Sequence, residues 1–139
     1  MTRDDILAMF ERRRAAYAAK DAGALARDYS PDCVIESPIG GVHRGPLHAE
    51  QVLRTVMSAL DVTMHEEGLL VDGDEAAQIL RLEGVDSGEF LGLPPTARSF
   101  SVPGVFLYTL KDGQIAQERR IYDFTALLVQ IGLLKAKPI

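Results

Sequence analysis

The sequence predicts an α+β domain in which a curved antiparallel sheet wraps around helices near the N-terminus. Helical periodicity dominates the first 60 residues, whereas most of residues 62–122 show the patterns of extended strands. The dipeptide Asp112-Gly113 joins the last two extended segments, and Asp-Gly is a strong signal for a two-residue hairpin turn. Helices followed by hairpin-linked strands are typical of α+β folds, and a sheet bent over helices can enclose a cone-shaped pocket.

The composition indicates one globular domain over residues 1–139, with 47% hydrophobic and 25% charged residues. The net charge of −5 argues against nucleic acid as a partner. The arginine run Arg12-Arg13-Arg14 lies in a helical segment and is interpreted as a solvated face. No stretch approaches the roughly 18 apolar residues of a membrane span, and the first residues are charged. We therefore expect a cytoplasmic protein without a membrane partner.

The expected elements follow from apolar spacing and from residues that begin or end a helix. Thr2 or Asp4 can cap the first helix, Asp21-Ala-Gly23 breaks it, and Pro46 suits the first turn of the third helix. The helices are expected over residues 2–20, 24–29, 46–60 and 124–134. The strands are expected over residues 33–36, 42–44, 62–71, 76–85, 98–110 and 114–122.

Counting outward from the Asp112-Gly113 turn gives the expected register of the last hairpin. Regular alternation places Leu110 opposite Ile115 and Phe106 opposite Arg119. One face would then carry Phe106, Tyr108, Leu110, Ile115, Gln117, Arg119, Ile121 and Asp123, and the other Leu107, Thr109, Ala116, Glu118, Arg120 and Tyr122.

The first of these faces is mainly apolar with a few polar groups, which is typical of a small-molecule pocket. We expect the substrate-binding residues to be Phe106, Tyr108, Arg119 and Ile121 from the hairpin, together with Tyr17 from the first helix. The other face is half apolar, and such a surface predicts a homodimer through the outer side of the sheet.

Asp123 ends the last strand, immediately before the closing helix, and is the candidate catalytic residue. A carboxylate enclosed by apolar groups is costly to keep ionised, so it could exchange protons near neutral pH. Arg119 lies on the same expected face, roughly 13 Å away along the strand. The two side chains could contact opposite ends of one ligand, or Arg119 could equally reach solvent or a neighbouring subunit.

Several segments resemble one known family. The loop Gly88-Glu-Phe-Leu-Gly-Leu-Pro-Pro-Thr96 resembles the signature loop of SnoaL-like polyketide cyclases. The segments Asp112-Gly-Gln-Ile-Ala-Gln-Glu118 and Asp123-Phe-Thr-Ala-Leu-Leu-Val-Gln-Ile-Gly132 are similar to the strand and closing helix of that family. The earlier features Asp21-Ala-Gly23, Glu36-Ser-Pro38, Arg44-Gly45 and Asp72-Gly-Asp74 fall in the family's order.

The resemblance implies the cone-shaped α+β barrel of the nuclear-transport-factor-2-like (NTF2-like) superfamily. It also implies a small apolar or polyketide-like substrate and no metal or cofactor. In these cyclases a pocket aspartate acts as general acid/base in an intramolecular aldol closure, and Asp123 matches the aspartate before the closing helix. The related ketosteroid isomerases place their base just before a proline, where this chain has Ser37. Serine cannot serve as that base, so isomerisation by that route is disfavoured.

The histidines and the cysteine give no further site. No spacing among His43, His48 and His65 is typical of a metal site, and we expect each histidine to be exposed or hydrogen-bonded. His65 lies on a strand and is the histidine that could enter the pocket. Cys33 lies in an apolar strand pattern, which predicts a buried, unreactive thiol.

Two functional hypotheses remain open at this point. The first is a cofactor-independent enzyme of the cyclase, isomerase or hydrolase kind that uses Asp123 as acid/base. The second is a noncatalytic module that binds a small apolar molecule. The environment of Asp123 separates them, because an exposed carboxylate, or one held by backbone hydrogen bonds, would weaken the enzyme hypothesis.

Overall fold

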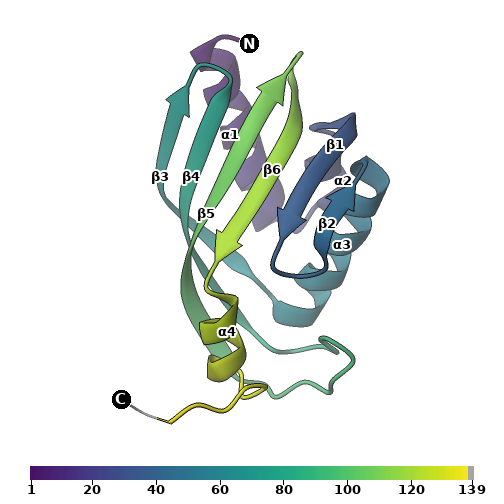
Figure 1. Ribbon diagram of the computed structural model, residues 1–139, viewed down its shortest axis with the longest axis vertical. Helices are drawn as coiled ribbons and strands as arrows, with labels where there is room; N and C mark the ends of the chain where they lie inside the picture. Colours follow the sequence, from purple (N-terminus) through teal and green to yellow (C-terminus); the bar gives the residue numbers. More distant parts are fainter. Residues whose placement is uncertain (138–139) are drawn as a thin grey trace.

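The computed structural model describes residues 1–137, and within them it contains four helices and one six-stranded sheet (Figure 1). The helices are α1 (Arg3–Ala18), α2 (Ala22–Ala26), α3 (Pro46–Leu60) and α4 (Phe124–Gln130). The strands are β1 (Tyr29–Ser37), β2 (Gly41–Arg44), β3 (Thr63–Asp72), β4 (Glu75–Val85), β5 (Ser99–Lys111) and β6 (Gln114–Tyr122).

The predicted α+β fold with a curved sheet is confirmed. The strand order is β2-β1-β6-β5-β4-β3, and α1 lies across one face of the bent sheet (Figure 1). Two details differ from the prediction. The β1–β6 pair is parallel while the other neighbouring strands are antiparallel. The sheet is also not a closed barrel, because β2 and β3 are its two edges.

The element boundaries differ from the prediction mainly in the short elements. Gly23, which was expected in the break after the first helix, lies within α2, and Asp21 caps that helix by accepting from the backbone N–H of Ala24. β1 begins four residues before the predicted position at Cys33. α4 ends at Gln130 rather than Leu134, because Gly132 has a φ of 84° and a left-handed residue there ends a helix.

The β5–β6 hairpin departs from its predicted register after the two pairs of residues next to the turn. Leu110 faces Ile115 as predicted, but Thr109 faces Gln117, so Ala116 is an extra residue in β6 and forms a β-bulge. Side chains alternate strictly along a strand, so one extra residue moves all later side chains to the opposite face. Phe106 therefore faces Arg120 rather than Arg119.

As a result, the predicted faces of β6 are exchanged beyond the bulge. Glu118, Arg120 and Tyr122 turn toward the helices, and Arg119 and Ile121 are exposed on the outer face. The prediction failed because Ile115 and Ile121 fit regular alternation, whereas the true inner face of β6 carries charged residues.

The main apolar core lies between α1 and the inner face of the sheet. Ile6, Met9 and Phe10 of α1 are buried against it, and the ring of Phe10 meets that of Tyr108 edge-on, with centroids 4.9 Å apart. These contacts fix α1 across the concave side of the sheet, as the sequence predicted.

The end of α3 lies close to two glycines, Gly84 in β4 and Gly88 in the loop that follows β4. A Cβ atom at Gly84 of β4 would collide with the carbonyl oxygen of Leu60 and lie 2.8 Å from the ring of Phe100. A Cβ atom at Gly88 would lie 2.8 Å from the carbonyl oxygen of Ser58. The absence of these side chains lets α3 approach the sheet and form one wall of the cavity described below.

This close approach predicts that Gly84→Ala lowers the free energy of unfolding by about 1–3 kcal/mol, because the added methyl group meets backbone that cannot yield easily. Gly68→Ala is the matched control, since its Cβ atom would have ordinary contacts, the nearest at 3.5 Å from Ile79. Urea unfolding of both variants checks this, and equal effects of the two substitutions would contradict it.

Candidate active site

A cavity of about 80 Å³ lies between α3, the inner face of the sheet and α4. Its walls are mostly apolar, and two flexible methionines, Met57 and Met64, are among them. The lining residues come from three helices, the sheet and the loops between them: Tyr17, Ser37, Ile39, Val52, Leu53, Val56, Met57, Leu60, Val62, Met64, Leu82, Phe100, Phe106, Arg120, Tyr122 and Leu127.

A few side chains bring polar groups to this apolar cavity: Tyr17 from α1, Ser37 from the end of β1, and Arg120 and Tyr122 from β6. The hydroxyl of Tyr17 is buried and has no hydrogen-bond partner among residues 1–137. Within the same described range, no aspartate or glutamate lines the cavity. An unpartnered buried hydroxyl is costly, which marks Tyr17 as a group that a ligand oxygen could satisfy.

The guanidinium of Arg120 is held in place by side chains that do not themselves line the cavity, Glu118 and Tyr29. Its Nε donates to Glu118 Oε2 at 2.5 Å, and its Nη2 donates to the hydroxyl of Tyr29 at 3.4 Å. The guanidinium also lies 5.8 Å from the ring centroid of Phe106, its cross-strand partner. These contacts fix a cation at the edge of an apolar space.

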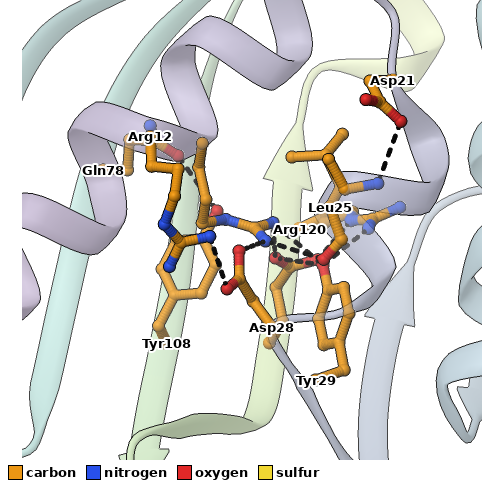
Figure 2. Close-up of polar contacts among 11 residues, drawn as sticks. Arg12, Asp21, Leu25, Asp28, Tyr29, Gln78, Tyr108 and Arg120 are labelled. Carbon is orange, nitrogen blue, oxygen red and sulfur yellow. Dashed lines mark hydrogen bonds and ion pairs between the residues drawn. The ribbon is translucent and has the colours of Figure 1, made fainter.

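Arg120 belongs to a buried charge cluster that also contains Arg13, Asp28, Tyr29 and Glu118. Figure 2 shows polar contacts in this region and labels Asp28, Tyr29 and Arg120 of the cluster. Arg13 Nη1 donates to Asp28 Oδ2 at 3.0 Å, and Arg13 Nη2 donates to the Tyr29 hydroxyl at 3.3 Å. That hydroxyl in turn donates to Glu118 Oε1 at 2.9 Å. Two cations and two carboxylates balance one another, which is the condition under which buried charges are tolerated.

Burial and the cluster together set the protonation of the cavity groups. Burial raises the pKa of Tyr17, and the nearby Glu118 carboxylate raises it further, so the phenol remains a hydrogen-bond donor at neutral pH. Burial alone would lower the pKa of Arg120, but the charge of Glu118, its hydrogen bond to Arg120, and the nearby Tyr29 and Tyr17 together outweigh burial. The pKa is raised, so Arg120 remains a cation. Burial also raises the pKa of Tyr122, while Ser37 and the charge of Arg120 act in the opposite direction.

The structure separates the residues that the sequence predicted to form one site. Tyr17 and Phe106 line the cavity, although their role in binding stays a prediction. Tyr108 is buried outside the cavity and donates to Gln78 Oε1 at 3.0 Å. The predicted positions of Arg119 and Ile121 in the pocket are wrong: both lie on the outer face, and Arg119 pairs with Glu36 at 3.3 Å.

The predicted position of Asp123 inside an enclosed pocket is also wrong. Its side chain is exposed, and it is the N-cap of α4, where a carboxylate oxygen accepts a hydrogen bond from the backbone N–H of Ala126 at 2.9 Å. Aspartate is among the preferred residues at such a cap. The acid/base role predicted for Asp123 depended on a buried carboxyl group, and the Asp123 side chain is exposed.

The interpretation of the arginine run as a solvated face is wrong for its middle residue. Arg13 is only 1% exposed, whereas the side chains of Arg12 and Arg14 are 60% and 42% exposed. The sequence did carry a signal, because Arg13 follows Ile6, Met9 and Phe10 at helical spacing and so falls in the apolar stripe of α1. Arg120 and Glu118 gave no comparable signal, since regular alternation placed them outside.

Neither the cysteine nor His65 contributes to the cavity. Cys33 is buried as predicted, and burial raises the pKa of its thiol. His65 does not enter the cavity; it is half exposed and lies 3.2 Å from Glu83. Among the described residues, no three histidine, cysteine or carboxylate side chains are arranged to hold a metal ion.

No helix in the described range is long and apolar enough to cross a membrane.

Comparison with known proteins identifies the family. The sequence profile of the SnoaL-like polyketide cyclases matches residues 8–131. The chain belongs to this family. It is 32% identical over 94 residues to the nogalonic acid methyl ester cyclase of Streptomyces nogalater, an alignment that covers 66% of this chain and 70% of that enzyme.

Solved structures agree with this assignment. TsrD from Streptomyces laurentii has a TM-score of 0.83 and 28% identity, with 96% of this chain and 99% of that chain covered. AclR from Streptomyces galilaeus, at 22% identity, has the same fold, with a TM-score of 0.83 and coverage of 99% and 91%. Family membership and the cyclase relative support a cyclase/isomerase-type role, and the chain has the same fold as solved proteins named NTF2-like.

The buried tyrosines predict a loss of stability at alkaline pH. The pKa values of Tyr17, Tyr29 and Tyr108 are all raised, first of all by burial. Above the unfolded value of about 10, the unfolded chain loses phenol protons that the folded chain keeps. The contribution of these tyrosines to the free energy of unfolding should therefore be constant below about pH 10 and fall above it, by at most about 1.4 kcal/mol per pH unit for each tyrosine.

Urea unfolding between pH 8 and pH 11 measures this dependence. Tyr17→Phe removes one of these buried phenols and should make the alkaline decline shallower. A wild-type stability that does not change up to pH 11 would be inconsistent with buried, protonated tyrosines.

Proposed function

We propose that this chain binds a small, largely apolar, polyketide-like molecule in the cavity and acts on it as a cyclase/isomerase-type enzyme with its own side chains. The observation that carries the proposal is the convergence of Tyr17, Arg120 and Tyr122 on an otherwise apolar space. Apolar walls with a few fixed polar groups are the usual composition of a small-molecule site. The methyl ester on which the Streptomyces nogalater relative acts is the natural first candidate substrate.

In the proposed mechanism, Arg120 and Tyr17 donate to a substrate oxygen on which negative charge develops. Ring closure or isomerisation next to a carbonyl begins when the α-carbon loses a proton, here to a water molecule, and water returns a proton to the product. Fixed donors stabilise the enolate-like state between these two steps without reorganisation. Arg120 is fixed by Glu118 and Tyr29 before any ligand arrives. Asp123 has no part in this mechanism, because its exposed carboxylate serves α4 as a cap.

A noncatalytic binding module is the second candidate. The observation that favours it is that no carboxylate lines the cavity within residues 1–137, so no obvious base faces a bound substrate. In this alternative the same polar groups hold a ligand oxygen, and no bond is made or broken.

The two candidates are separated by incubation with nogalonic acid methyl ester, followed by chromatography and mass spectrometry. We expect conversion to a ring-closed product. Arg120→Gln should lower kcat/KM by about 10²–10³-fold, since it removes a charged donor to the developing oxyanion. Tyr17→Phe should lower it about tenfold, as for the loss of one hydrogen bond of about 1.4 kcal/mol.

Asp123→Asn is the matched control, because asparagine also caps helices well. It should leave kcat/KM within about twofold of the wild type. Loss of turnover in Asp123→Asn with retention in Arg120→Gln would restore the aspartate mechanism. Tight binding of the ester without turnover would select the binding module.

We also infer that two copies of the chain pair through the outer face of the sheet. Ile79, Val105 and Ile121 lie in cross-strand register on this face, and Ile79 and Ile121 are exposed. Such an apolar row favours burial against a second copy.

Light scattering should show a dimer at micromolar concentration, and Ile121→Asp should give a monomer. Leu47→Asp is the matched control, because Leu47 is an exposed apolar residue on α3, away from this face, and its substitution should leave the dimer intact. A monomeric wild type would refute the inference.

A further inference from the structure

We infer that the ligand carries an acidic hydroxyl, an enol or a phenol, and that the cavity holds it as the anion against Arg120. This inference rests on the proposed function, because it concerns the same cavity. It goes further by naming the ionisation state and the chemical class of the ligand. The inference follows from which hydrogen-bond donors and acceptors the cavity offers.

Arg120 has hydrogen-bonding capacity to spare. A guanidinium carries five N–H donors, and here Glu118 and Tyr29 engage only Nε and Nη2. Among residues 1–137, no group accepts a hydrogen bond from Nη1. Arg120 lines the cavity whereas Glu118 does not, so a ligand oxygen meets the cation before it meets the balancing carboxylate. Because electrostatic energy falls with distance, the nearer charge contributes more to the energy of that oxygen.

Tyr17 supplies a second donor. Its hydroxyl is buried and unpartnered among the described residues, and its raised pKa keeps the proton in place. A hydrogen bond from a neutral hydroxyl to an anion is shorter and stronger than one to a neutral oxygen. An oxyanion that touches Arg120 and Tyr17 would satisfy both groups at once.

The cavity offers little to a neutral hydroxyl. A neutral enol or phenol must donate its own proton, and no carboxylate among the described residues lines the cavity to accept it. The hydroxyl of Ser37 has one of its two acceptor sites occupied, because it accepts a hydrogen bond from the backbone N–H of Ile39 at 3.1 Å. Burial raises the pKa of the neighbouring Tyr122 hydroxyl, and the charge of Arg120 opposes that rise, so a ligand hydroxyl at that position meets the same opposing field. The ligand's proton leaves to bulk water when the anion binds.

The test uses 4-nitrophenol, whose phenolate has its own visible absorption band, and 4-nitroanisole, its methyl ether, which cannot ionise. Each probe is titrated with the full chain at a pH one unit below the phenol's own pKa, where most of the free probe is protonated. We expect bound 4-nitrophenol to show the phenolate band. Arg120→Gln should abolish this band and weaken 4-nitrophenol about tenfold or more, while 4-nitroanisole affinity stays within about twofold.

Three further variants keep the test decisive. The double variant Glu118→Gln/Arg120→Gln removes both members of the ion pair, so it is informative even if Arg120→Gln alone fails to fold. Tyr17→Phe should reduce the phenolate fraction partly, and Asp123→Asn should not change it. If both probes bind but the phenol stays protonated, the inference is overturned and the proposed pocket stands. If neither probe binds, both the inference and the proposed site are wrong.

Discussion

The single extra residue Ala116 decides which side chains of β6 face the helices. Without the bulge, Ile121 would face inward and Glu118, Arg120 and Tyr122 would face outward. With it, two charged residues enter the interior of a strongly curved sheet. The cavity, its cation and the burial of Arg13 all depend on this shift, because each involves a side chain that the bulge turns inward.

Charges in the interior require partners, and the partners come from the N-terminal helices. Arg13 on α1 and Asp28 after α2 complete the cluster around Glu118, and the Tyr29 hydroxyl connects Arg13, Glu118 and Arg120. Removing one member would leave an uncompensated buried charge, which is far more costly than the net gain from the pair. The cluster therefore couples the position of α1 to that of β6. A wall of the cavity is thus built from the same groups that hold the two layers together.

The order of elements was predictable because it depends on local signals. The Asp112-Gly113 turn, Pro46 at the start of α3 and the helical period of α1 each act within a few residues. The site was less predictable. Nothing in the sequence indicated the bulge at Ala116, and one extra residue in a strand reverses the predicted face of every later side chain. Asp123 and Arg119 were misplaced for this reason. The hydrogen bond between Tyr29 and Glu118 spans 89 residues of sequence, and nothing in either local pattern indicates it.

The register of β5 and β6 also determines which polar groups this member of the family places in its cavity. A SnoaL-like chain is expected to act on a polyketide-like molecule. Among residues 1–137, the groups that line the cavity include a cation and hydroxyl groups but no carboxylate. In the proposed function, the fold supplies the apolar enclosure and the inward residues of β6 determine what kind of oxygen binds there.

The register of the β5–β6 hairpin is therefore the most direct test of the account. Nuclear Overhauser contacts between backbone protons of the two strands measure it in solution. The account predicts contacts that pair Leu107 with Arg119 and Phe106 with Arg120. Contacts that pair Phe106 with Arg119 would show regular alternation, would turn Arg120 outward, and would contradict the account.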